Sequence, residues 1–107
     1  MSWYTASLFF VSKHSDHDLE EELWEESFFL IQASTQQEAF EKAEAIGKEQ
    51  ECSYLVTVGD SAHWSFVKVE RVVEVMQENL CDGAELFSRF LRSKEAISLL
   101  TPIEENE

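Results

Sequence analysis

The hydrophobic positions of this chain fall into short, dense runs, and most of the runs predict strands. Residues 3–12 carry aromatic or aliphatic side chains at both the odd and the even positions of an extended chain. A strand that is apolar on both faces is typical of a central place in a sheet, because both of its faces are covered there. Runs of the same kind predict further strands at 25–33, 53–58, 63–75 and 84–91.

The run at 63–75 changes phase along its length. Trp64 and Phe66 share one parity, whereas Val67 and Val69 begin a series on the other parity. One extra residue in an antiparallel strand produces such a shift, since it moves all later side chains to the opposite face. We therefore expect a β-bulge near Phe66 and Val67.

A helix is predicted for residues 35–50. Ser34 or Thr35 can accept a hydrogen bond from the first turn, and Gln37 or Glu38 follows three residues later, which is the pattern of a capping box. The apolar positions after this cap recur at helical spacing: Ala39, Phe40, Ala43 and Ile46.

The C-terminal part begins with a turn signal and ends in a second helix. Asp82-Gly83 predicts the turn before the strand at 84–91. Ser93 can cap a short helix over residues 94–100, which ends before Pro102.

These elements predict the α+β class. In the order β-β-α-β-β-β, about five strands form an antiparallel sheet covered by one long helix, with a short C-terminal helix. The length favours a single domain over residues 1–100. It carries an acidic insert at 13–27 and is followed by an acidic flexible tail at 101–107.

The charge of the chain limits its partners. It has 22 acidic and 8 basic residues and a formal charge of −14, yet it is 44% hydrophobic, so it is expected to fold. A negative field of this size repels nucleic-acid backbones and anionic membranes and speeds encounters with a basic protein. We therefore predict a basic protein partner, with no nucleic acid and no membrane.

The sequence also suggests where the protein resides. No signal peptide opens it, and its apolar runs are far shorter than the roughly 20 residues that a membrane-spanning helix needs. Cys52 and Cys81 are two cysteines without the spacing of a metal site or a disulfide framework. We expect partly buried, reduced thiols and a cytoplasmic protein.

Short motifs in a fixed order give the chain a family resemblance. They are Trp3-Tyr4-x-Ala6, Glu25-Glu26, Glu38-Ala39, Gly47, Tyr54, Gly59, Trp64-x-Phe66, Asp82-Gly83 and Phe87-Ser88-Arg89-Phe90. With them the chain resembles, over about residues 3 to 91, a family of small bacterial proteins known only as a domain of unknown function. The resemblance implies a compact α+β domain and assigns no activity, so it transfers no catalytic residue. The insert after Lys13 and the tail after Arg92 lie outside the shared pattern.

The acid-rich segment before the second strand is the leading candidate for a binding surface. Its acids would steer a basic partner, and its apolar residues would anchor that partner. The candidate residues are Asp16, Asp18, Leu19, Glu20, Glu21, Glu22, Leu23 and Trp24. On this hypothesis the chain is a non-enzymatic adapter or inhibitor. The alternative for the segment is a solvated loop that only keeps the protein in solution.

A second hypothesis is a homo-oligomer, such as a homodimer, that binds a small anion in a pocket around Tyr54, Trp64 and Arg89. Arg89 would hold the anion with its guanidinium group, or else form a structural ion pair with a carboxylate. His14, Asp16, His17 and Asp18 carry atoms that metals accept, but without cysteine or fixed geometry we predict no metal and no cofactor.

Overall fold

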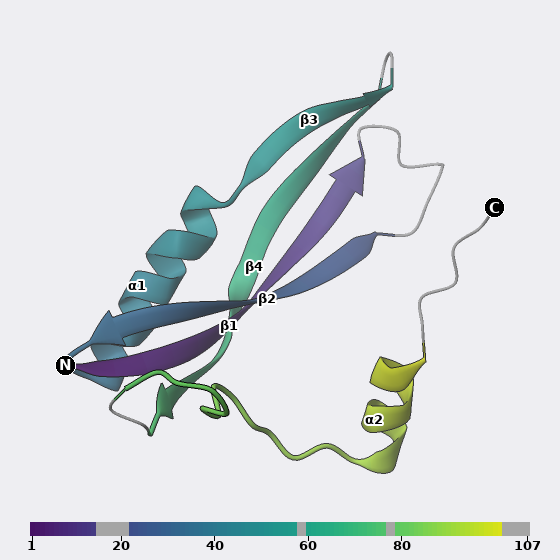
Figure 1. The fold of residues 1–107 in the computed structure, drawn as a ribbon. Coiled ribbons are helices and arrows are strands. Elements are labelled where there is room, and N and C mark those ends of the chain that lie inside the picture. The colour runs from purple at the N-terminus through teal and green to yellow at the C-terminus, as the bar shows by residue number, and fades with distance from the viewer. Residues whose placement is uncertain (15–21, 58–59, 77–78, 102–107) are drawn as a thin grey trace.

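A computed structural model describes residues 1–14, 22–57, 60–76 and 79–101. In these ranges the chain forms an α+β fold with four strands and two helices (Figure 1). The elements are β1 (Ser2–His14), β2 (Leu23–Ala33), α1 (Gln36–Glu49), β3 (Cys52–Thr57), β4 (Asp60–Val75) and α2 (Ser93–Leu100). The strands make one curled antiparallel sheet in the order β2-β1-β4-β3.

β1 lies inside the sheet, between β2 and β4, as its two apolar faces predict. Its pairing with β2 runs from Ser2 opposite Ala33 to Ser12 opposite Leu23. Because β1 continues to His14, only residues 15–22 separate the two strands, so the predicted insert at 13–27 is too long at both ends. Residues 15–21 lie outside the described part of the chain, and so do residues 102–107 of the predicted tail.

The predicted fifth strand at 84–91 is wrong. These residues are extended but form no described strand, and the sheet ends at β2 on one side and at β3 on the other. Apolar side chains at 84–91 suggested a strand, yet Phe87 packs on Phe28 at the face of the sheet, while Phe90 is fully exposed. We call residues 84–101, which include α2, the C-terminal arm.

β4 contains the predicted bulge and a second one. Phe9 pairs with Lys68 and Phe10 with Phe66, so Val67 is the extra residue of the first bulge. The register shifts again between Ser7 and Leu8. There the pairing moves from Arg71 to Val69 and skips Glu70. The two bulges place Val72, Val69 and Phe66 on the same face at intervals of three residues.

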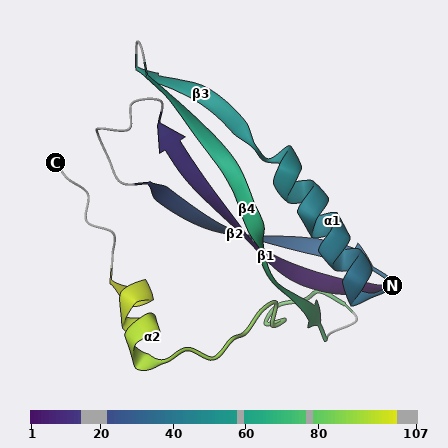
Figure 2. The same cartoon turned by 180° about the vertical axis from the view of Figure 1, so that it is seen from behind.

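α1 covers one face of the sheet, where it packs on β4, β2 and β1 (Figures 1 and 2). Its buried positions are small, namely Ala39, Ala43 and Gly47, so the helix can approach the strands closely. Beneath it lies the core, formed by Tyr4, Ala6, Leu8, Phe10, Ile31, Ala33, Val69 and Val72. This is the helix face of the sheet; we call the opposite side the open face.

The start of α1 confirms the predicted cap at Thr35, whereas the Glu38 carboxylate bonds the amide of the preceding residue, Ser34, and not that of Thr35. The Thr35 hydroxyl accepts a hydrogen bond from the Glu38 amide at 3.1 Å, and the Glu38 carboxylate accepts one from the Ser34 amide at 2.6 Å. Thr35→Ala is expected to lower the free energy of unfolding by about 1 kcal/mol, because the amide then loses its partner in the protein. Urea unfolding measures the change. Thr35→Ser keeps the hydroxyl and should cost less; equal losses would contradict the role of the cap.

Candidate protein-binding surface

Four side chains of β2 form a row on the open face: Trp24, Glu26, Phe28 and Leu30. They lie there because each pairs with an odd-numbered residue of β1, while the even-numbered residues of β1 face α1. Trp24 is 53% exposed, Phe28 52% and Leu30 42%. β2 is also an edge strand, so one side of its backbone has no described strand beside it. An edge with exposed apolar groups is a surface on which another chain can dock.

The predicted partner-binding residues are only partly within the described chain. Glu22, Leu23 and Trp24 lie at the start of β2, and all three are exposed. Leu23 is 54% exposed and points to the helix face, opposite Ser12, whereas Trp24 points to the open face. The other five predicted residues, Asp16, Asp18, Leu19, Glu20 and Glu21, lie outside the described residues.

A polar cluster lies at the middle of the open face. The Ser7 hydroxyl is fully buried and donates a hydrogen bond to Glu26 Oε2 at 2.7 Å. Arg89 Nη1, from the C-terminal arm, lies 3.5 Å from the same oxygen. Both charged side chains are largely covered, with 23% of Arg89 and 20% of Glu26 exposed. Arg89 thus forms the structural ion pair that was one of its two interpretations, and an anionic ligand would have to compete with Glu26.

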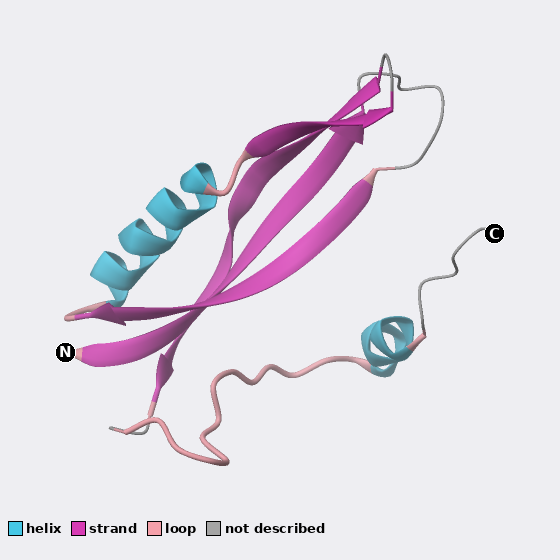
Figure 3. Ribbon diagram, turned by 45° about the horizontal axis from the view of Figure 1, so that its top comes forward, coloured by secondary structure: helices cyan, strands magenta, loops and turns pink. Residues whose placement is uncertain are grey.

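The arm reaches this cluster across the open face, on the side away from α1, as Figure 3 shows for its path toward α2. The arm begins with a turn, in which the Ala84 N–H donates a hydrogen bond to the Cys81 carbonyl at 3.0 Å. Gly83 in this turn has a φ of +87°, which glycine adopts without strain. The Phe87 ring then packs on Phe28, with centroids 5.0 Å apart.

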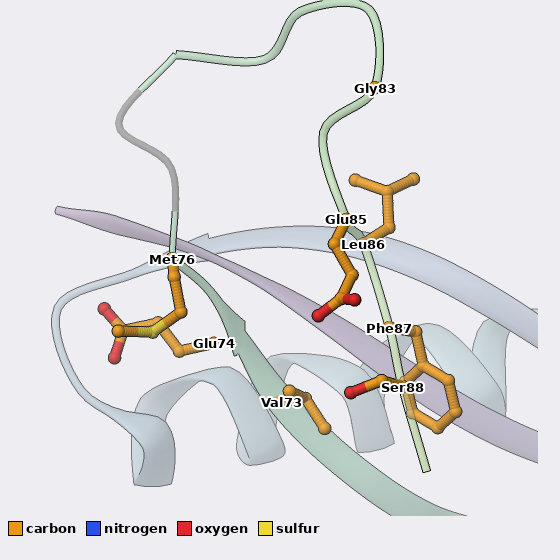
Figure 4. A pocket seen from close by; sticks show the side chains of 8 residues that line it. All are labelled: Val73, Glu74, Met76, Gly83, Glu85, Leu86, Phe87 and Ser88. Atoms are coloured by element: carbon orange, nitrogen blue, oxygen red, sulfur yellow. The ribbon is translucent and has the colours of Figure 1, made fainter.

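Figure 4 shows a shallow hollow of about 170 Å³ where the arm leaves β4. Val73, Glu74 and Met76 line one side of it, and Gly83 and residues 85–88 line the other. Its charged groups are the carboxylates of Glu74 and Glu85, and none of its described lining residues is basic. The hollow therefore has no evident chemistry of its own.

Trp64 and Arg89 lie on opposite faces of the sheet. Trp64 pairs with Ser12 and packs against the core on the helix face, whereas Arg89 contacts Glu26 on the open face. Tyr54 lies in β3, opposite Ala62, and its side chain is outside the described part. The structure therefore does not bring Trp64 and Arg89 into one pocket.

Other residues with possible chemistry are exposed. Ser53 Oγ lies within hydrogen-bond distance of His63 Nδ1 across β3 and β4, but both side chains are open to solvent, so nothing excludes water from them. Cys52 and Cys81 form no disulfide within the described part of the chain, and both are exposed rather than partly buried. The described residues contain no group of three or more possible metal ligands; Asp16, His17 and Asp18 lie outside them.

The sequence interpretation did not predict that the Phe28 and Phe87 rings pack together. It also treated Glu26 only as one of two adjacent acids and not as the partner of Arg89. A usable signal was present, because Trp24, Glu26, Phe28 and Leu30 alternate along one strand. The packing of Phe87 on Phe28 was not predictable while residues 84–91 were taken for a strand.

Fold and surface together define a small α+β domain with one covered face, one partly open face and an exposed apolar edge strand. The chain belongs to the family described as domain of unknown function DUF4288, whose model matches residues 3–88. The match ends before Arg89 and α2, so most of the arm lies beyond it. The comparisons with curated proteins and with solved structures gave no match. Neither described helix has the length and apolarity that a membrane crossing requires.

Proposed function

We propose that this chain is a non-enzymatic interaction protein that binds a basic partner protein at the start of β2. The observation that carries the proposal is the exposure of Leu23 and Trp24 directly after an acid-rich segment. More than half of each side chain faces solvent, and Glu22 and Glu25 beside them are exposed as well. Large apolar groups next to like-signed charges suit a partner that brings its own apolar residues and basic groups.

Charge and apolar contact have separate roles in this binding. The net charge of −14 attracts a basic protein over several ångströms and raises the association rate, an effect that salt weakens. Trp24 supplies the area that leaves water on contact, and tryptophan is enriched among residues whose truncation costs an interface most. The acids therefore govern how fast the partner arrives, and Trp24 governs how long it stays.

A variant of this surface tests the proposal. Trp24→Ala combined with Glu20→Lys, Glu21→Lys and Glu22→Lys is expected to weaken binding of the basic partner at least about thirtyfold, which corresponds to about 2 kcal/mol. A tagged pull-down at low and high salt identifies the partner, and calorimetry with the purified partner measures the dissociation constant.

The matched control changes the same number of charges elsewhere. Glu41, Glu44 and Glu49 of α1 are replaced by lysine, together with Met76→Ala, an equally simple truncation of an exposed apolar residue. The control complex should dissociate at the wild-type rate, and only its association should be slower. Equal affinity of wild type and test variant would refute the proposed surface. A small-anion pocket shared by Trp64 and Arg89 has less support, because these two residues lie on opposite faces of the sheet.

A further inference from the structure

The C-terminal arm differs chemically from the rest of the chain. Arg89, Arg92 and Lys94 are three of the eight basic residues, and only one acid, Glu95, lies between positions 89 and 101. The arm is also apolar at its surface: Phe90, Ile97, Leu99 and Leu100 are all more than half exposed. A basic, apolar arm is thus attached to an acidic body whose edge strand is itself apolar and exposed.

The interactions of the arm inside the chain show what it recognises. Phe87 packs on Phe28, and two residues later Arg89 pairs with Glu26, two residues earlier in β2. The arm therefore runs opposite to β2 and matches its row of side chains, aromatic to aromatic and cation to anion. Two complementary interactions at the same spacing define a docking surface for this kind of segment.

The chain's own arm covers that surface only in part. Phe28 stays 52% exposed beneath Phe87, and an open hollow of about 440 Å³ is lined by Phe9, Arg89 and Leu99 of α2, among others. Among the described elements none packs against α2, whose Ile97 and Leu100 are 63% and 82% exposed. A helix of eight residues gains little stability on its own and depends on packing of its apolar side.

We propose that a second copy of the chain completes this surface, and that the two copies exchange their C-terminal arms. The arm of each copy lies on the open face of the other, so that Phe87 meets the second copy's Phe28 and Arg89 meets the second copy's Glu26. Such an interface is two-fold and closed, because both complementary surfaces belong to the same chain. Exchange costs little, since the arm makes the same interactions with the second copy as it makes within its own chain. The new contact between the two copies gives α2 a surface to pack on, which the described elements of the single chain do not provide.

Electrostatics favour this arrangement over other modes of association between two copies. Two bodies of charge −14 repel each other, and the arm is the region with an excess of basic residues. Salt at physiological strength screens the bodies beyond about 8 Å, while the Arg89–Glu26 pair is short and largely covered. The inference stands apart from the proposed function, because it requires no basic partner.

Charge exchange between two variants tests whether the ion pair forms between chains. The exchanged dimer contains two contacts between position 89 of one copy and position 26 of the other. Either single variant, Arg89→Glu or Glu26→Arg, places like charges at both contacts and should raise the dimer dissociation constant about tenfold or more. An equal mixture of the two variants restores opposite charges in the pairs between unlike chains, but only if the arms are exchanged. Sedimentation velocity and light scattering should show a wild-type dimer, weakened single variants and a restored mixed dimer.

Several results would overturn the proposal. A wild-type protein that stays monomeric at every concentration, or a dimer that neither variant weakens, excludes this interface. If each variant weakens the dimer and the mixture restores nothing, the ion pair forms within one chain. Circular dichroism checks that each variant is folded, because Glu26→Arg also removes the acceptor of the buried Ser7 hydroxyl.

A second variant avoids that polar cluster. Ile97→Ser with Leu100→Ser changes two side chains of α2 that are exposed in the single chain, so the monomer should unfold at the same urea concentration. In the exchanged dimer these side chains are buried, and the dissociation constant should rise about tenfold or more. Met76→Ser with Leu80→Ser, both exposed outside the arm, is the matched control. An unchanged dissociation constant in the α2 variant would refute the packing of α2 on the second copy.

Discussion

Replacing Leu8 by alanine is expected to lower the free energy of unfolding by about 3 kcal/mol. Leu8 is the largest apolar side chain with no exposed surface among the described residues, and it lies on the central strand under α1. Its truncation removes apolar area from the core and leaves a cavity, because strands on both sides hold the backbone in place. For a domain whose total stability is about 5–15 kcal/mol, this is a large fraction.

Thermal and urea unfolding both measure the effect. The melting temperature should fall by roughly 12–24 °C, given about 4–8 °C per kcal/mol for a domain near 100 residues. Leu86→Ala is the control, since Leu86 is 48% exposed and lies in the arm. Its loss should be well below about 1 kcal/mol. Similar losses in the two variants would mean that Leu8 is not at the centre of the core.

Gly47→Val is expected to cost about 3 kcal/mol, because a β-carbon at this position has no room. A Cβ built there lies 2.5 Å from two ring carbons of Phe66. The ring cannot easily move away, since it packs against the core and lies 5.7 Å from the Phe10 ring. The substitution therefore either pushes α1 off the sheet or forces Phe66 out of its rotamer, and both weaken the helix face.

Two controls separate this clash from the cost of valine in a helix. Ala45 is an exposed position of α1, so Ala45→Val reports the effect of helix propensity alone, which is below about 1 kcal/mol. In a Phe66→Leu background the smaller side chain should recover at least about 1 kcal/mol of the Gly47→Val loss. A strictly additive double variant would show that Phe66 is not the obstacle.

Local signals predicted the elements of this fold well. The capping residues Thr35 and Glu38 located the start of α1, and dense apolar runs located the four strands within a few residues. The phase change at Val67 also predicted a bulge correctly, because alternation in a strand depends on neighbours along the sequence. The second bulge, at Glu70, left no such signal, since it returns the strand to its first parity.

Long-range interactions were less predictable. The segment 84–91 has a composition that suits a strand, yet neither its composition nor its length shows whether it joins a sheet edge or crosses a face. Arg89 illustrates the limit: the sequence left open an anion site beside Tyr54 and Trp64 or an ion pair with an unspecified carboxylate. The partner is Glu26, which is 63 positions away in the chain. Such a choice depends on how the sheet curls and which face α1 leaves uncovered, and both are properties of the whole domain.

The two bulges of β4 compensate each other. Each one reverses which face the odd-numbered residues point to, so the two together restore the original alternation. Between Val67 and Glu70 the odd-numbered residues face α1, whereas at both ends of the strand the even-numbered residues do. Val69 therefore faces α1 only because it lies inside that short stretch. Deletion of Val67 alone would leave Phe66 opposite Phe10 and Lys68 opposite Phe9, so every other side chain would keep its face. Deletion of a paired residue would instead turn the side chains on one side of the deletion to the opposite face. β4 can therefore lose an extra residue at a bulge, whereas the loss of a paired residue disrupts the core.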